Sequence, residues 1–201
     1  MARTNGIAKV TPERRSGVIR IAVSYAWPEG KTARTDKKWA ALRNLLQSVC
    51  SEAHKRAVKL DGKSDIRFSV SRLRASHGTL VLGALVERIR SADAYVADVA
   101  AEDGDSCNPN VMVEVGLAIA SRHGENDTLF LLKPKELSSK PEKFPFPSNL
   151  QGVLWTEYLR KTDDLSLIDL PGFTAALRSR LLRAAIERGL LRPKGRIYVD
   201  E

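Results

Sequence analysis

The sequence predicts a doubly wound α/β fold, in which helices flank both faces of a parallel sheet of about five strands. The first observation is that segments patterned as strands alternate with segments patterned as helices along most of the chain. The second is that "VIRIAVSYAW", near the start, is a continuous apolar run rich in β-branched residues, as expected of a strand buried on both faces. The third is the length, since 201 residues favour one domain with terminal extensions.

The first half of the chain supplies two strands and two helices. Residues 1–17 form a polar lead-in that we expect to be flexible, and the first strand follows it. "IRFSV" is a short second strand, and "TLVLGALVERIRSA" has a helical pattern. The helix between the two strands has Asp36 as a plausible N-cap and apolar residues at helical spacing: Trp39, Leu42, Leu46, Val49 and Ala53.

The second half continues the alternation. "DAYVADV" is the third strand, and a helix follows it from Pro109 to about His123, with Asn108 able to cap and Pro109 suited to the first helical position. "DTLFLLK" and "GVLWTEY" are the fourth and fifth strands. A last helix covers "PGFTAALRSRLLRAAIERGL", and the end of the chain is expected to be extended or disordered.

Composition favours a soluble, cytoplasmic globular protein. The chain is 43% hydrophobic and 28% charged, and no run approaches the roughly 18 apolar residues of a membrane-spanning helix. The start lacks the apolar segment of a signal peptide. The 2 cysteines and 3 histidines have no metal-binding spacing, so we expect no metal and a reducing compartment.

The net charge of +9 raises the question of an anionic partner. Much of the excess lies between residues 171 and 196, where Glu187 is the single acid. We favour a solvated helix face over nucleic-acid binding, because aromatic residues that could stack on bases are not interleaved with the arginines.

Ligands of doubly wound sheets bind at the carboxyl ends of the strands, where the strand order reverses. This rule selects the loops 24–35, 71–78 and 98–110. The chain has neither a GxGxxG motif after the first strand nor a GxxxxGK[ST] motif, so the usual dinucleotide fingerprint and the P-loop are both absent.

Glu114 is the most informative residue of this region. On a helical wheel, Val111, Val115, Ala118 and Ile119 form an apolar stripe, and Glu114 lies at its margin, near the helix end that points toward the ligand crevice. A partly desolvated carboxylate there is a candidate for chemistry. The alternative is that Glu114 reaches solvent and benefits from the helix dipole.

The stretch from residue 91 to residue 120 resembles the signature of bacterial TIR-like domains and of the related nucleoside 2-deoxyribosyltransferase-like proteins. The shared pattern is an alanine-aspartate, a strand ending in aspartate, Asn-Pro-Asn-Val, and a helix with Glu-x-Gly-x-Ala. The matching positions are Ala92-Asp93, Asp98, Asn108-Pro109-Asn110-Val111, Glu114, Gly116 and Ala118. Ser24-Tyr25 and the strand ending in Tyr158 also agree, whereas Val113 stands where the family often has an aromatic residue.

The resemblance covers roughly residues 18–160 and implies a flavodoxin-like or TIR-like nucleotide-binding domain, followed at 161–201 by a basic helix and tail. It also implies that Glu114 is the catalytic carboxylate of an enzyme that cleaves NAD, as substrate and not as cofactor, to nicotinamide and an ADP-ribose product. An oxocarbenium-like transition state carries positive charge on the ribose, which a carboxylate stabilises.

The other candidate site residues each have a structural alternative. Ser24 and Tyr25 could contact the ribose or phosphates, and Trp27 could stack on a base or belong to the core or a lid. Arg72 could contact the pyrophosphate. Asp98 either contacts ligand or caps its loop, and we interpret Cys107 as a bystander. The Asn-Pro-Asn motif gives two further candidate ligand-binding residues, Asn108 and Asn110. Asn110 either contacts ligand or braces the start of the helix.

Three functions therefore stay open. The leading one is a TIR-type NAD hydrolase acting in bacterial anti-phage defence, which self-association or an activating partner protein would control. The second is nucleoside or nucleotide 2-deoxyribosyl transfer or hydrolysis, with Glu114 as nucleophile. The third is a non-catalytic nucleotide-binding or TIR-type interaction module.

Overall fold

A six-stranded sheet forms the centre of the protein, with the strand order β2-β1-β3-β4-β5-β6. The structure, a computed structural model, describes residues 16–26, 36–62, 65–73, 81–101, 106–121, 126–135, 154–161 and 164–192. Neighbouring strands from β2 to β5 are parallel, and β6 is antiparallel to β5. The strands are β1 (Ser16–Ser24), β2 (Asp65–Arg72), β3 (Ala94–Asp98), β4 (Leu129–Pro134), β5 (Leu154–Lys161) and β6 (Asp164–Leu167).

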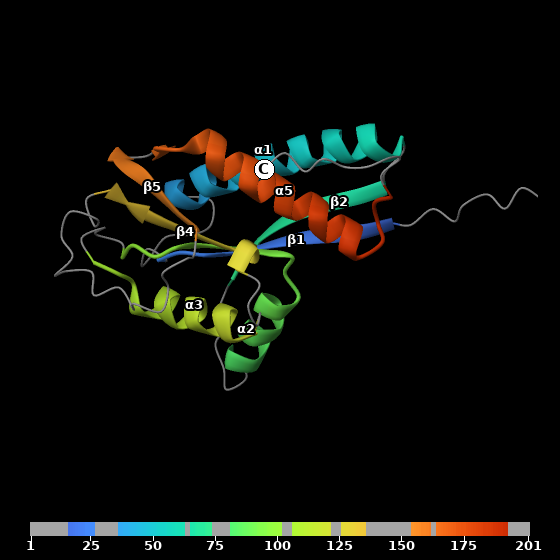
Figure 1. Ribbon diagram of the computed structural model, residues 1–201. Helices are drawn as coiled ribbons and strands as arrows, with labels where there is room; N and C mark the ends of the chain where they lie inside the picture. Colours follow the sequence, from blue (N-terminus) through green and yellow to red (C-terminus); the bar gives the residue numbers. More distant parts are fainter. Residues whose placement is uncertain are drawn as a thin grey trace, which may run out of the picture.

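Helices cover both faces of the sheet (Figure 1). The first layer consists of α1 (Lys37–Asp61) and α5 (Leu170–Glu187), which pack against each other above the sheet in this view. The second layer, below the sheet, consists of α2 (Val81–Arg90) and α3 (Pro109–Ser121), and a short 3-10 helix, η1 (Asn126–Thr128), precedes β4. This arrangement confirms the predicted doubly wound α/β fold.

The central strand β3 contributes side chains to two hydrophobic cores, one on each face of the sheet. Its residues are all buried, and their side chains alternate between the two faces. Ala94 and Val96 belong to the core under α1 and α5, whereas Tyr95 and Ala97 belong to the core under α2 and α3. The continuous apolar runs of the sequence are therefore explained by burial on both sides.

α1 begins where the sequence predicts. Asp36 is its N-cap, and the carboxylate accepts a hydrogen bond from the backbone N–H of Trp39 at 3.0 Å. The residues with predicted helical spacing are all buried: Trp39, Leu42, Leu46, Val49 and Ala53. None of the described helices is long and apolar enough to cross a membrane.

α3 confirms the predicted cap and corrects the predicted apolar stripe. The side-chain oxygen of Asn108 accepts hydrogen bonds from the backbone N–H groups of Asn110 and Val111, both at 3.0 Å. Val111 is buried as predicted, as are Val115 and Ala118, but Ile119 is 40% exposed. At about 100° per residue, Ile119 lies about 80° round the helix from Val111, which turns it outward on the flank opposite Glu114.

The start of β1 and the number of strands differ from the predictions. β1 begins at Ser16, so the last two residues of the predicted lead-in belong to the sheet. β6 is an additional strand that was not predicted, because its four residues have no distinctive pattern and form a strand only beside β5. α5 belongs to the same core as β1 and α1, through buried side chains such as Phe173, Leu177 and Leu181.

Candidate functional site

The strand order reverses between β1 and β3, and this is where doubly wound sheets bind their ligands. β2, the next strand along the chain, pairs with one side of β1, and β3 pairs with the other side of β1. Ser24 is the last residue of β1 and Asp98 is the last residue of β3, so both lie at the carboxyl edge of the sheet. α3 starts shortly after β3 and therefore has its N-terminal turns at the same edge.

Three side chains form a hydrogen-bonded chain at this point. The hydroxyl of Ser24 donates to Oε2 of Glu114, and the hydroxyl of Tyr95 donates to Oγ of Ser24 at 2.6 Å. They come from β1, α3 and β3 respectively, so the chain joins the two strands of the reversal to the following helix. Glu114 is partly buried, and it faces the sheet as the wheel position predicts.

The surroundings of Glu114 disfavour its charged form. Desolvation by burial raises the pKa of this carboxyl group, and the hydrogen bond from Ser24 acts in the opposite direction. Burial also raises the pKa of Tyr95, which keeps the phenol protonated as a donor to Ser24. Within the part of the chain that the structure describes, no cation pairs with Glu114. A cationic group brought to this edge would therefore meet a carboxylate that none of the described cations neutralises.

Tyr25 lies on the opposite face of the sheet from Ser24. Its hydroxyl donates to Oδ2 of Asp36 at 2.5 Å and accepts a hydrogen bond from Nη1 of Arg72 at 2.7 Å. Its ring stacks on Trp39 with the ring centres 5.9 Å apart, and the guanidinium of Arg72 lies 5.4 Å from the centre of the Trp39 ring. Burial raises the pKa of Tyr25. This network braces the start of α1, so the structure does not bring Tyr25 and Arg72 together with Glu114.

Asp98 also lies on the α1 side of the edge, and its carboxylate has partners within the protein. Lys38 Nζ is 2.7 Å from Oδ2, and the hydroxyl of Tyr158 donates to both carboxylate oxygens at 3.1 Å. The backbone N–H of Ala100 donates to Oδ1 at 3.2 Å. The side chain of Asp98 has no exposed surface, so it fixes the end of β3 from inside.

The remaining predicted contacts are placed as follows. Asn108 caps α3, and Asn110 is exposed at the first turn of that helix. Trp27 lies outside the described residues, as do large parts of the three predicted ligand loops. Burial raises the pKa of Cys107 to about 11, so it is a thiol at neutral pH, which agrees with a bystander role.

Tyr95 and the partners of Asp98 were not predicted as members of the site. Tyr95 could have been found from strand alternation, because Ser24 pairs in register with Ala97 and so shares a face with Tyr95, two residues earlier in β3. Lys38 and Tyr158 reach Asp98 from elements distant in sequence, and no local pattern indicates that contact. Among the described residues, no cluster of three His, Cys, Asp or Glu could hold a metal ion.

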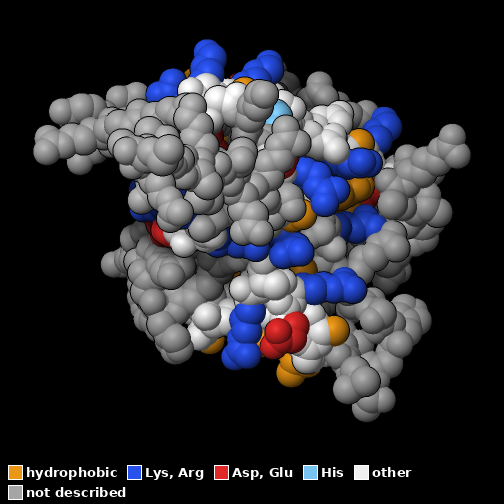
Figure 2. All heavy atoms as spheres, turned by 90° about the vertical axis from the view of Figure 1, so that its right-hand side faces the viewer, with side chains coloured by type: hydrophobic (Ala, Val, Ile, Leu, Met, Phe, Trp, Pro, Cys, Tyr) orange, Lys and Arg blue, Asp and Glu red, His pale blue; other side chains and the backbone are white. Residues whose placement is uncertain are grey.

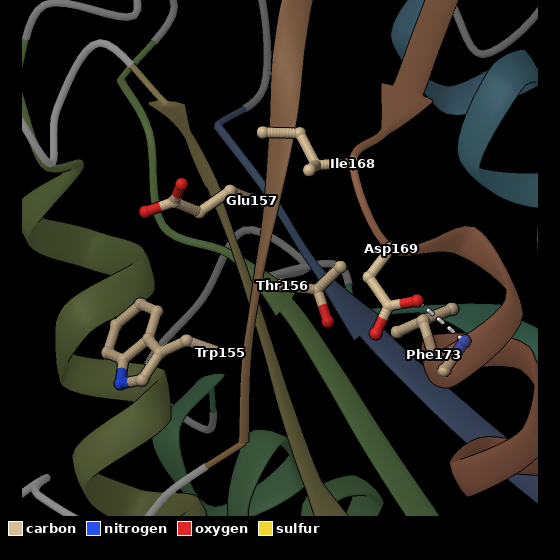
Figure 3. A pocket seen from close by; sticks show the side chains of 7 residues that line it. Trp155, Thr156, Glu157, Ile168, Asp169 and Phe173 are labelled. Carbon is tan, nitrogen blue, oxygen red and sulfur yellow. Dashed lines mark hydrogen bonds between the residues drawn. The ribbon is translucent and has the colours of Figure 1, made fainter.

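A cavity of about 300 Å³ lies away from Glu114, between β5 and the start of α5 (Figure 3). Trp155 and Glu157 point to one side of β5, whereas Thr156 points to the other side, toward Asp169 and Phe173. Asp169 already accepts a hydrogen bond from the backbone of Gly172 as the N-cap of α5. None of the three hydrogen-bonded residues Ser24, Tyr95 and Glu114 lines this cavity. We therefore place the chemistry at the reversal of strand order instead.

Comparisons with known proteins do not assign a family. No protein-family model matches this sequence, and no curated protein does. Several solved structures are similar to the chain at low scores, and three of them are described next.

The first is described as a metal-soaked Flv1 flavodiiron core from Synechocystis sp. PCC6803, with a TM-score of 0.39 and 13% sequence identity. The similarity covers 85% of this chain and 36% of the Flv1 chain, so this chain spans about a third of the length of Flv1. The second is FerB, a flavoenzyme NAD(P)H:(acceptor) oxidoreductase from Paracoccus denitrificans, with a TM-score of 0.33, 10% identity, and coverage of 84% and 98%. The third is an oxidoreductase from Corynebacterium diphtheriae, with a TM-score of 0.37, 15% identity, and coverage of 88% and 98%. With TM-scores below 0.5, these similarities carry no inference about this chain.

Proposed function

We propose that this protein hydrolyses the bond between ribose and nicotinamide in NAD, with Glu114 as the catalytic carboxylate. The observation that carries the proposal is the partly buried carboxylate of Glu114, held by Ser24 at the reversal of strand order with no cationic partner in the described residues. The resemblance of residues 91–120 to TIR-like domains supports the same residue in the same role.

The charge changes of this reaction suit one carboxylate. As the bond between the anomeric carbon and the ring nitrogen breaks, both bonding electrons go to nitrogen, and the pyridinium leaves as neutral nicotinamide. No general acid is therefore needed for departure. Positive charge moves to the anomeric carbon and ring oxygen of ribose, where the carboxylate of Glu114 stabilises it more than it stabilises the ground state. Water then adds to the anomeric carbon and loses a proton to the solvent, which gives ADP-ribose.

Ser24 acts as a positioning residue in this scheme. Its hydrogen bond holds the carboxylate of Glu114 toward the strand edge and favours the charged form, against the effect of burial. Tyr95 fixes the Ser24 hydroxyl by donating to it, so that the Ser24 proton points to Glu114. A ligand with a cationic ring would supply a positive charge next to this carboxylate.

The experiment compares the wild-type chain with Glu114→Gln and with Glu87→Gln as a matched control. The control removes the same charge from an exposed glutamate on α2. Nicotinamide release from NAD is measured at high protein concentration, so that the self-association implied by the resemblance can occur. We expect Glu114→Gln to lose about 10²–10³-fold or more in rate, while the control keeps its activity.

A second arm offers deoxynucleosides together with a free base. Base exchange that depends on Glu114, without nicotinamide release from NAD, would replace NAD hydrolysis by deoxyribosyl transfer. Nicotinamide release that survives Glu114→Gln would remove the carboxylate from its proposed role. The part in anti-phage defence and the control by an activating partner stay predictions from the resemblance.

A further inference from the structure

The amino edge of the sheet lies at the opposite end of the strands from Glu114. The helices α1, α2 and α5 run antiparallel to the parallel strands, so their last turns reach this edge, which is the right-hand side of Figure 1. Leu190, just after α5, packs so close to Gly17 at the start of β1 that a side chain at Gly17 would collide with it. Residues 188–192, which follow α5, are therefore at the same edge.

Cationic side chains gather on this edge. Figure 2 faces it and shows many more Lys and Arg side chains than acidic ones among the coloured residues. We name this surface the basic face. It is formed by exposed residues of the last turns of α1 and α2, of β2, and of the segment after α5: Lys55, Arg56, Lys59, Arg67, Arg88, Arg90 and Arg192.

Arginines of α5 and its C-cap have structural partners and do not belong to the basic face. Arg183 is 2.7 Å from a carboxylate oxygen of Asp127, and Arg188 bonds to Asp93 at 3.0 Å and to the carbonyl of Val18 at 2.8 Å. These contacts tie α5 to the sheet and to η1. They account for part of the positive charge of this helix without any external partner.

Several cations of the basic face, by contrast, have no structural partner among the described residues. Within the part of the chain that the structure describes, the side chains of Arg56, Lys59, Arg67 and Arg192 form no hydrogen bond or ion pair, and neither does Lys55. The favourable effect of a cation on a helix C-terminus explains Lys59, in the last turn of α1, but not Arg67 on a strand. Unpaired cations from separate elements repel one another, so the surface gains stability when an anion neutralises it.

Carboxylates at this edge reduce the positive charge only in part. Glu87 is 3.6 Å from Arg90, and Asp93 is paired with Arg188. The large hydrophobic side chains that are exposed lie elsewhere, in the first turn of α2, on α3, and near the junctions of β5, β6 and α5: Leu82, Val113, Ile119, Leu159, Ile168 and Leu170. A surface that inserts into a membrane interface combines cations with a continuous set of exposed apolar groups, whereas the hydrophobic side chains that Figure 2 shows on this face are scattered between the cations.

We propose that the basic face binds the phosphate backbone of nucleic acid without sequence preference. Arginine outnumbers lysine on it, and the guanidinium group matches phosphate geometry in two hydrogen bonds. No described tryptophan, tyrosine or phenylalanine is exposed on it, so phosphate contacts, and not base stacking, supply the affinity. Because the face is remote from Glu114, bound nucleic acid leaves the carboxyl edge accessible.

The test measures binding of a short labelled DNA duplex of mixed sequence by fluorescence anisotropy, between about 50 and about 200 mM salt. The variant Arg56→Gln/Lys59→Gln removes two cations of the basic face. The matched control Arg43→Gln/Lys135→Gln removes two exposed cations elsewhere, one from the earlier part of α1 and one just after β4. Circular dichroism checks that each variant is folded.

We expect the wild-type affinity to fall steeply with salt and the basic-face variant to have a slope of log affinity against log salt lower by about 1.8, because each lost phosphate contact contributes about 0.9. The control is expected to keep the wild-type slope. An equal decrease of this slope in both variants would show that net charge, and not this face, controls binding. Absence of binding at the lowest salt, or binding to phosphatidylserine vesicles in place of the duplex, would overturn the proposal.

Discussion

The ion pair between Lys38 and Asp98 gives the sharpest prediction about how the carboxyl edge is held together. Asp98 has no exposed surface, and Lys38 Nζ lies 2.7 Å from its carboxylate. Replacing Lys38 by methionine keeps an unbranched side chain that is one atom shorter and uncharged, and it leaves a buried carboxylate without its cation. Removal of one partner of a buried ion pair costs about 3–5 kcal/mol.

Two structural features place Lys38→Met at the lower end of that range. The Tyr158 hydroxyl and the Ala100 N–H still donate to Asp98, and 28% of the Lys38 side chain is exposed, so water already screens the pair in part. We therefore expect a loss of about 3 kcal/mol in the free energy of unfolding. At roughly 2–4 °C per kcal/mol for a chain of this size, Tm falls by about 6–12 °C.

Urea unfolding followed by tryptophan fluorescence, in a double-mutant cycle with Asp98→Asn, measures the interaction. Asp98→Asn alone should cost about 1–2 kcal/mol, because Lys38 can reach water once its partner is neutral. The double variant should be about 2 kcal/mol more stable than the sum of the single effects. Lys55→Met, an exposed substitution on the same helix, is the control and should change stability by less than about 0.5 kcal/mol. Additivity within about 0.5 kcal/mol would show that the buried pair is not formed.

Further predictions concern Glu114 and the core. The activity proposed here needs ionised Glu114, whose pKa is raised by burial, so the rate should decline on the acid side at a higher pH than an ordinary glutamate would give. Ser24→Ala removes the hydrogen bond that lowers this pKa and should move the decline to still higher pH. An unchanged pH-rate profile in this variant would contradict the role of Ser24. Because the folded state raises the pKa of Glu114, its burial costs stability as pH rises from the ordinary glutamate value through the folded-state value. Glu114→Gln should therefore raise the free energy of unfolding at neutral pH but not below the ordinary value, and urea unfolding at both pH values checks the sign. Leu177→Ala should cost about 2–5 kcal/mol in the same assay, because Leu177 is fully buried between α5 and the sheet; a smaller loss would contradict the placement of α5 in the core.

Part of the candidate site could be predicted because its signals are local. The wheel position of Glu114 depends only on helical periodicity, and it placed the side chain on the flank that contacts Ser24. The caps at Asp36 and Asn108 follow from a short polar side chain directly before a helix. The division between Ser24 and Tyr25 was not drawn from the sequence, although alternation along an extended strand sends neighbouring side chains to opposite faces.

Other features depend on contacts between distant segments. The Lys38–Asp98–Tyr158 cluster joins α1, β3 and β5, and no spacing along the chain indicates that these side chains meet. The same holds for β6, whose four residues become a strand only because the backbone of β5 offers hydrogen-bonding partners.

The sequence by itself determined the alternation of strands and helices, because side-chain periodicity and capping act within a few residues of each other. Only the tertiary structure decided the strand order and the face on which each polar side chain lies, because burial and hydrogen bonding at the carboxyl edge depend on segments that folding brings together.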